Sequence, residues 1–178
     1  MTSDEGESLL EMIQSTNRNG NLLYRASRDG FTALAFHEKC DGKSNTVTII
    51  KTDEDYVFGG YTSAAWHSKG NFIKDANAFI FSLRKKGILV DKKKFKIKNE
   101  NKAIYGNLKF GPVFGESDIV IKEGLFKETI SFSKLCDSYK CPPGFEFRKA
   151  RQFLAGSSKW LTTEIEVYRI NRLVHLIA

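Results

Sequence analysis

One histidine and three cysteines are the residues best suited to bind a metal. His37 and Cys40 lie three positions apart, and Cys136 and Cys141 lie five positions apart later in the chain. A structural zinc site uses four such ligands, usually arranged as two closely spaced pairs. These four residues could make a His-Cys₃ site, but their spacing fits only loosely. Because unpaired thiols more often act as small buried hydrophobes, we expect no metal here.

The same thiols raise the alternative of redox chemistry. Lys134 and Lys140 lie near Cys136 and Cys141, and nearby positive charge lowers the pKa of a thiol. In this hypothesis Cys136 is the attacking thiolate and Cys141 is its resolving partner. The chain has no Cys-x-x-Cys motif, so we keep peroxide chemistry only as an alternative. An odd number of cysteines argues against a disulfide framework and favours a reducing, cytoplasmic or nuclear setting.

Three carboxylates form a second candidate group. Glu164 and Glu166 are two residues apart on an expected strand, so they share a face, and Asp29 could join them. A pair of like charges can raise one pKa, as acid–base catalysis requires. The simpler interpretation is a solvated sheet face with salt bridges to Arg25 and Arg28. We predict that the three carboxylates contact a partner and that none is catalytic.

A basic segment carries the net charge of the chain. Nine basic and two acidic residues lie between Arg84 and Lys102, a net charge of +7, which equals that of all 178 residues. Nucleic acid or anionic lipid could bind here, but Phe95 is the only aromatic residue in the segment, and stacking on bases would need more. A strand edge protected by lysines against aggregation is the alternative. The candidate basic patch is Lys85, Lys86, Lys92, Lys93, Lys94, Lys96 and Lys98.

The length fits one domain with a core of its own, and 41% of the residues are hydrophobic. No apolar run approaches the roughly 20 residues needed to cross a bilayer. The first seven residues are acidic and lack the features of a signal peptide. These properties predict a globular domain.

The hydrophobic pattern predicts mostly short strands. A short helix is expected over residues 8–13, and a second begins at Asp29 or Thr32 and stops at Gly42. We expect Gly111-Pro112 to interrupt the chain between two strands. Alternating apolar residues predict strands at 22–24, 46–50, 56–61, 78–83, 93–97, 104–105, 118–121 and 164–168. Many short strands at this spacing are typical of an antiparallel β-sandwich.

The order of several segments resembles the TLDc domain family. These segments are Leu22 to Phe31, Phe36 to Gly42, Phe58 to Tyr61, Asn77 to Leu83 and Phe110 to Gly115, with a final match around Glu164 to Tyr168. The resemblance implies an α+β fold, an antiparallel two-sheet β-sandwich edged by short helices. We therefore expect a helical lead-in over residues 1–21, a TLDc-like domain over 22–170 and a tail over 171–178.

The resemblance also implies a function. The TLDc family is associated with protection from oxidative damage and with binding to the vacuolar-type proton pump, the V-ATPase, and it has no settled catalytic activity. We expect a non-catalytic protein-interaction module without a cofactor, in the cytoplasm or brought to the nucleus or an organelle surface by a partner. Two alternatives stay open: the TLDc-like N-terminal segment of an interferon-induced GTPase-like protein of innate defence, and a thiol-dependent antioxidant enzyme.

Overall fold

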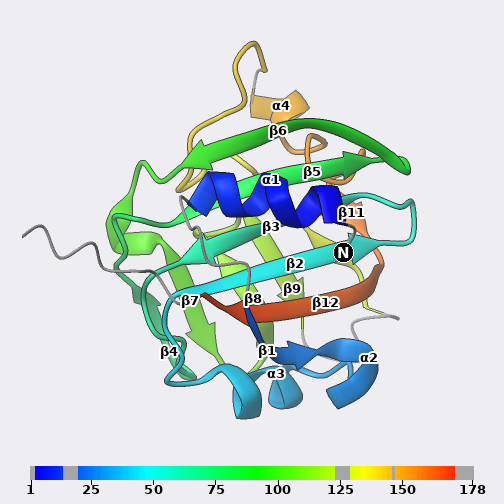
Figure 1. The fold of residues 1–178 in the computed structure, drawn as a ribbon. Helices are drawn as coiled ribbons and strands as arrows, with labels where there is room; N and C mark the ends of the chain where they lie inside the picture. Colours follow the sequence, from blue (N-terminus) through cyan, green and yellow to red (C-terminus); the bar gives the residue numbers. More distant parts are fainter. Residues whose placement is uncertain (1–2, 14–19, 123–128, 146, 171–178) are drawn as a thin grey trace, which may run out of the picture.

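Two six-stranded sheets make up the body of the protein in the computed structural model, which describes residues 3–13, 20–122, 129–145 and 147–170. Every strand pairing in both sheets is antiparallel. The first sheet, which faces the viewer in Figure 1, has the order β1 (Asn21–Arg25), β12 (Thr162–Arg169), β2 (Thr46–Thr52), β3 (Val57–Thr62), β5 (Phe79–Lys85) and β6 (Ile88–Lys96). The second has the order β11 (Lys159–Trp160), β10 (Ser131–Phe132), β9 (Ile119–Lys122), β8 (Phe110–Phe114), β7 (Ile104–Asn107) and β4 (Lys69–Ile73).

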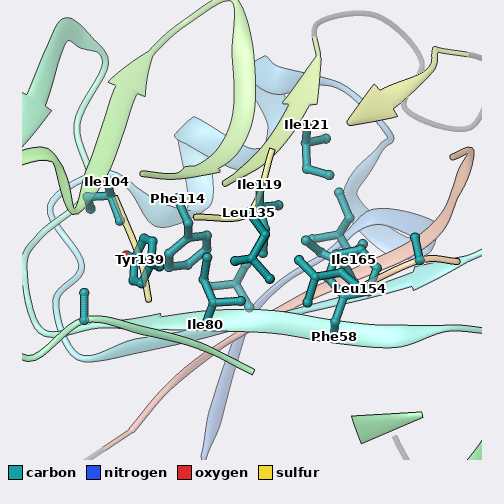
Figure 2. Packing of buried hydrophobic residues seen from close by; sticks show 14 of the residues in the cluster. Phe58, Ile80, Ile104, Phe114, Ile119, Ile121, Leu135, Tyr139, Leu154 and Ile165 are labelled. Carbon is teal, nitrogen blue, oxygen red and sulfur yellow. The ribbon is translucent and has the colours of Figure 1, made fainter. Parts of the chain in front are cut away.

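The main core lies between the two sheets. Successive side chains of a strand point to opposite faces, so alternate residues of β12 enter this core, and Ile165 and Val167 are fully buried there. From the facing sheet, Phe114 and Ile119 enter the same core, which Figure 2 shows with Ile165. The expected α+β sandwich of two antiparallel sheets is therefore confirmed.

A second core covers the outer face of the first sheet. Helix α1 (Ser3–Ile13) lies across this face in Figure 1 and buries Leu9 and Met12 against the strands. Phe79 and Phe81 of β5 point into this second core, while Ile80 between them points into the main core. Strand β5 is therefore covered on both faces. The helix is thus packed directly on the sheet that follows it in the chain.

Short helices lie at the edges of the sandwich. Thr32 begins α3 (Ala33–Cys40), because its side-chain oxygen accepts a hydrogen bond from the backbone N–H of Ala35 at 3.1 Å. The alternative start at Asp29 is wrong, since Asp29 is the last residue of a separate short helix, α2 (Ala26–Asp29). The remaining short helices described are η1 (Glu100–Lys102) and α4 (Phe147–Ala150). None of the helices described is long and apolar enough to span a membrane.

Two glycine-containing segments have special roles, one where the two sheets approach each other and one inside a strand. A Cβ atom at Gly60 of β3 would come within 2.5 Å of the Phe114 ring in the opposite sheet, so only glycine fits at this close approach. Gly111 and Pro112, in contrast, lie inside β8 and not between strands. The register of β8 against β9 shifts between Phe110 and Val113, and such an irregularity accommodates a proline that cannot donate to the ladder.

Candidate interaction surface

A hollow of about 520 Å³ opens on the outer face of the first sheet, on the part that α1 leaves uncovered. It is lined by outward-facing residues of β12, β2, β3 and β5 and is closed at its ends by α1 and by the junction of β1 and α2. Charged side chains of both signs surround it: Glu5, Arg25, Lys51, Arg84, Glu164 and Glu166.

Glu166 is fixed at one end of the hollow. It lies opposite Arg25 in the pairing of β12 with β1, and Arg25 donates to its Oε1 from Nε at 2.8 Å and from Nη2 at 2.7 Å. The Tyr168 hydroxyl donates to Oε2 at 3.0 Å. The charge of Glu166 raises the pKa of Arg25, whereas burial and then Glu166 raise the pKa of Tyr168. Glu166 is therefore a positioned acceptor with both carboxylate oxygens in use.

Glu164 and Asp29 hold the junction of β1 and α2. Oε1 of Glu164 accepts from the Ser27 backbone N–H at 3.1 Å, at the start of α2. Oδ2 of Asp29 accepts from the Arg25 backbone N–H at 2.9 Å and lies 2.7 Å from Nη2 of Arg28. The hydrogen bonds from Arg28 lower the pKa of Asp29. Glu164 and Glu166 face the hollow, whereas Asp29 lies behind its rim, and the salt bridges expected with Arg25 and Arg28 are present.

The opposite end of the hollow is built by residues that the motif analysis missed. Arg84 of β5 places Nη2 at 2.6 Å from Oε1 of Glu5 in α1 and Nη1 at 3.1 Å from Oδ1 of Asp55. Lys51 of β2 reaches the same Asp55 oxygen at 3.2 Å. Lys51 and Asp55 are only four residues apart, but Glu5 and Arg84 come from distant segments, so no local spacing in the sequence brings all four together. For Lys51 the available signal is its outward position on a strand beside Ile50, which is buried in the main core.

The side chains around the hollow suit recognition. The residues that line it include the hydroxyls of Ser27 and Thr163 but no histidine or cysteine. Arg25 pairs with Glu166 and Arg84 pairs with Glu5. The side chains of Arg25 and Lys51 are nevertheless 41% and 48% exposed, so the hollow keeps charged groups open to solvent. A surface of this kind offers charge-assisted hydrogen bonds to polar groups of a partner.

The basic segment is divided between the two faces of β6 and its ends. Lys94 lies over the Phe79 ring at 4.0 Å on the α1 side and donates to the backbone oxygen of Met12. Lys85 lies over the Phe153 ring at 3.5 Å, away from that helix. Lys86, Lys93 and Lys96 are exposed, Lys98 bonds the loop described next, and the side chain of Lys92 is outside the described set. The segment is therefore not one continuous patch, and part of its charge stabilises the fold.

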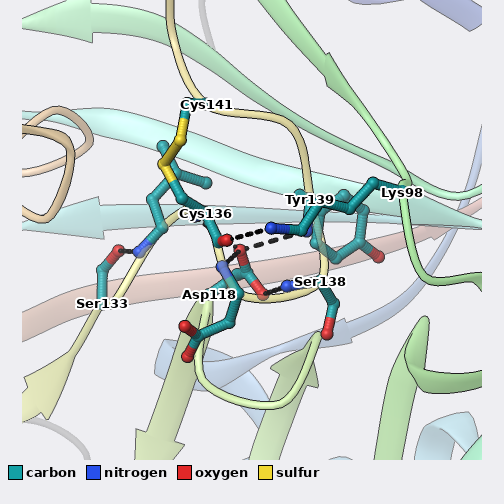
Figure 3. The surroundings of a disulfide bond; sticks show 9 residues. Lys98, Asp118, Ser133, Cys136, Ser138, Tyr139 and Cys141 are labelled. Carbon is teal, nitrogen blue, oxygen red and sulfur yellow. Dashed lines mark hydrogen bonds between the residues drawn. A yellow bond between two sulfur atoms is a disulfide. The ribbon is translucent and has the colours of Figure 1, made fainter. Parts of the chain in front are cut away.

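Cys136 and Cys141 form a disulfide in the loop between β10 and α4 (Figure 3). The odd cysteine count argued against disulfides, and for this pair the expectation is wrong. The loop turns tightly enough to bring the two Cα atoms to 4.8 Å, within the range that a disulfide needs. Sequence analysis paired the same two residues as redox thiols but gave no means of predicting this turn.

The four residues considered for zinc do not assemble into a site. Cys40 is fully buried in the main core, and burial raises the pKa of its thiol, so the metal-binding thiolate is disfavoured. His37 uses Nδ1 at 2.7 Å from Oδ1 of Asp41 and Nε2 at 2.9 Å from the backbone oxygen of Asn107. Within the described ranges, no group of three or more His, Cys, Asp or Glu residues is placed to hold a metal ion.

Comparison with known proteins agrees with this architecture. A stretch of 62 residues is 29% identical to the MTOR-associated protein MEAK7 of Danio rerio. This stretch makes up 35% of the present chain and 14% of that protein. The matched stretch thus spans only a small part of the relative. A family model described as the TLDc domain matches residues 1–171. Because that match takes in nearly the whole chain, the protein belongs to the TLDc domain family.

Proposed function

We propose that this TLDc domain is a non-catalytic protein-interaction module that binds a larger complex through the charged hollow on its first sheet. The V-ATPase is the first partner to test, in the setting of oxidative-stress protection that the family resemblance implies. The observation that carries the proposal is that three carboxylates and three cations lie together on one open face of the sheet. The carboxylates are Glu5, Glu164 and Glu166, and the cations are Arg25, Lys51 and Arg84. The module would act in the cytoplasm, at the surface where its partner resides.

The hollow favours a partner that presents polar side chains of both signs. Glu166 is only 7% exposed and pairs with Arg25, so it fixes the orientation of the half-exposed Arg25 guanidinium. Little further conformational entropy is then lost when this guanidinium binds a partner. Lys51 and Arg84 share Asp55 in the same way at the other end. Pre-organised charges of this kind determine the register of docking and raise the rate of association. Binding would then shift the assembly equilibrium of the partner complex.

A second partner follows from the matched relative. The name of MEAK7 associates that protein with MTOR. An MTOR-containing complex is therefore the alternative bait for the same surface. The alternative of an interferon-induced GTPase-like protein stays a prediction, which a phosphate-loop motif downstream of residue 178 would support.

The experiment is a pull-down of purified V-ATPase subcomplexes, with MTOR complexes in parallel, at low and high salt. Lys51→Glu reverses a half-exposed charge in the hollow, and Glu164→Gln keeps an acceptor oxygen for Ser27. We expect each variant to weaken retention by about tenfold, as for a lost charge contact at a docking surface. The matched controls are Lys109→Glu and Glu116→Gln on the second sheet side, which should bind like the wild type.

Two results would refute the proposal. One is no retention of either complex even at low salt. The other is that the Lys109 and Glu116 variants lose binding while the hollow variants keep it, which would place the docking surface on the opposite sheet.

A further inference from the structure

The two sulfur atoms of the disulfide have unequal access to solvent. Cys136 is 1% exposed, whereas Cys141 lies in the exposed part of the loop. A small thiol or a peroxide can therefore reach Cys141 but not Cys136. Thiol–disulfide exchange depends on which sulfur can be attacked. This reverses the roles expected from the sequence, where Cys136 was the attacking residue.

The loop around Cys136 is held by groups other than the disulfide. The buried Asp118 carboxylate accepts backbone N–H bonds from Cys136 at 3.0 Å and from Ser138 at 2.7 Å, and also from Asp137 and Tyr139 (Figure 3). Burial raises the pKa of Asp118 to about 7, although these N–H donors act in the opposite direction. Cys136 has φ of +99°, a conformation that favours glycine, and the carboxylate holds it there.

Further bonds join the loop to the end of β6 and to the segment between β6 and β7. The Lys98 ammonium donates to the backbone oxygen of Cys136, and the Lys140 N–H donates to the backbone oxygen of Lys96 at 2.9 Å. The buried Tyr139 hydroxyl donates to the backbone oxygen of Ala103 at 2.7 Å. These bonds hold the loop in addition to the S–S bond, so we expect the bond to open without unfolding the domain.

We propose that Cys136 and Cys141 are a redox-active pair, reduced by small thiols and re-oxidised by peroxide. The sulfur of Cys141 is the one that a small thiol attacks during reduction, and its thiolate is the one that attacks peroxide during re-oxidation. In reduction, a thiolate such as that of glutathione attacks Cys141 Sγ, and Cys136 leaves as a thiolate and takes a proton. A second small thiolate attacks the small-molecule sulfur of the mixed disulfide. That step releases the oxidised small thiol and the Cys141 thiolate.

Re-oxidation runs through Cys141 as well. Its thiolate attacks one peroxide oxygen, the O–O bond breaks, and the leaving hydroxide is protonated to water. The Cys136 thiolate then attacks Sγ of the resulting Cys141 sulfenic acid, and the S–O bond breaks to release a second water. Two electrons pass from the sulfur pair to one hydrogen peroxide. The exposed Lys140 is next to Cys141 in sequence, and positive charge of this kind favours the thiolate form of the attacking residue.

The test is performed on the full chain in glutathione mixtures of different redox ratio, with native alkylation and mass spectrometry to count free thiols. We expect one transition in which two thiols appear together, while circular dichroism stays that of the oxidised protein. Buried Cys40 should resist native alkylation and serves as the internal control. A disulfide that persists in fully reduced glutathione until the domain is denatured would overturn the proposal, as would loss of the fold on reduction.

Two single variants test the assignment of roles. Cys136→Ser leaves the exposed sulfur and should form a mixed disulfide with oxidised glutathione about tenfold faster than Cys141→Ser, because access controls the rate. Reduced wild type should consume one hydrogen peroxide for each disulfide re-formed, and Cys141→Ser should abolish that consumption. Equal or reversed trapping by the two variants, or peroxide consumption unchanged in Cys141→Ser, would refute the role of Cys141.

Discussion

Arg84 and Glu5 join the N-terminal helix to the first sheet through an ion pair of 2.6 Å. The Glu5 side chain is 1% exposed and that of Arg84 is 16% exposed, so the pair is largely withdrawn from water. The same contact closes one end of the charged hollow. The position of α1 and the shape of the proposed docking surface are therefore linked by one interaction.

Replacing Arg84 should destabilise the domain strongly. Arg84→Met removes the cation that pairs with the buried Glu5 carboxylate, and breaking a buried pair in this way costs about 3 kcal/mol. The exposed pair Lys74–Glu100, at 2.7 Å with side chains 64% and 44% exposed, provides the control. Lys74→Met should cost less than about 1 kcal/mol. Urea denaturation measures both, and equal effects would contradict the structural role of the buried pair.

Local patterning predicted which side chains of a strand point into a core. Phe79 and Phe81 alternate with Ile80, and Ile165 and Val167 alternate with Glu166, so the sequence period alone indicates the two faces of β5 and β12. The Arg84–Glu5 pair could not be predicted, because it joins residues of a helix and a strand that only the tertiary fold brings together. Long-range contacts of this kind leave no periodic signal.

Two local predictions failed for reasons that lie outside the local sequence. Asp29 and Thr32 are both good residues to begin a helix. The Asp29 carboxylate instead accepts from the backbone N–H of Arg25, the last residue of β1, so Asp29 lies at the end of α2 and Thr32 begins the next helix. Cys136 and Cys141 are close in the chain, but their turn is formed by hydrogen bonds to Asp118 from a different strand connection. Neither contact is visible from the flanking residues alone.

Gly60→Ala should destabilise the sandwich by overpacking. The added Cβ would lie 2.5 Å from the ring of Phe114, which is fully buried and cannot move aside freely. Forcing extra atoms into a packed core costs about 1–3 kcal/mol. Phe114→Leu removes part of the ring volume, so the double variant should be more stable than the sum of the single effects. Additive effects in thermal denaturation would argue against direct contact at this position.

Acid should weaken the fold through Asp75. Burial alone would raise the pKa of this carboxyl, but hydrogen bonds from Ser63 and Thr62 and from the backbone of Asn77 lower it below the ordinary value of 3.8. The unfolded chain therefore binds the proton more readily. The stabilisation is present above pH 3.8 and is lost as the pH falls through the lower pKa of the folded state.

Denaturation curves at several acidic pH values measure this dependence. Asp75→Asn should be less stable than the wild type near neutral pH and should show a flatter fall in stability below the ordinary pKa. Glu54→Gln, at an exposed turn position, is the control and should keep the wild-type profile. A wild-type profile in the Asp75 variant would show that its hydrogen bonds do not contribute.

Asp118→Asn tests whether the carboxylate holds the cysteine loop independently of the disulfide. The variant keeps one acceptor oxygen and turns an amide NH₂ toward the backbone donors of Cys136 and Ser138. Unpaired buried donors cost about 1–3 kcal/mol each, so we expect a lower thermal midpoint even with the disulfide intact. Reduction should then lower the midpoint further in the variant than in the wild type. Asp137→Asn, whose half-exposed side chain adjoins the loop, is the control. Equal sensitivity to reduction in all three proteins would show that the disulfide, and not Asp118, maintains the loop.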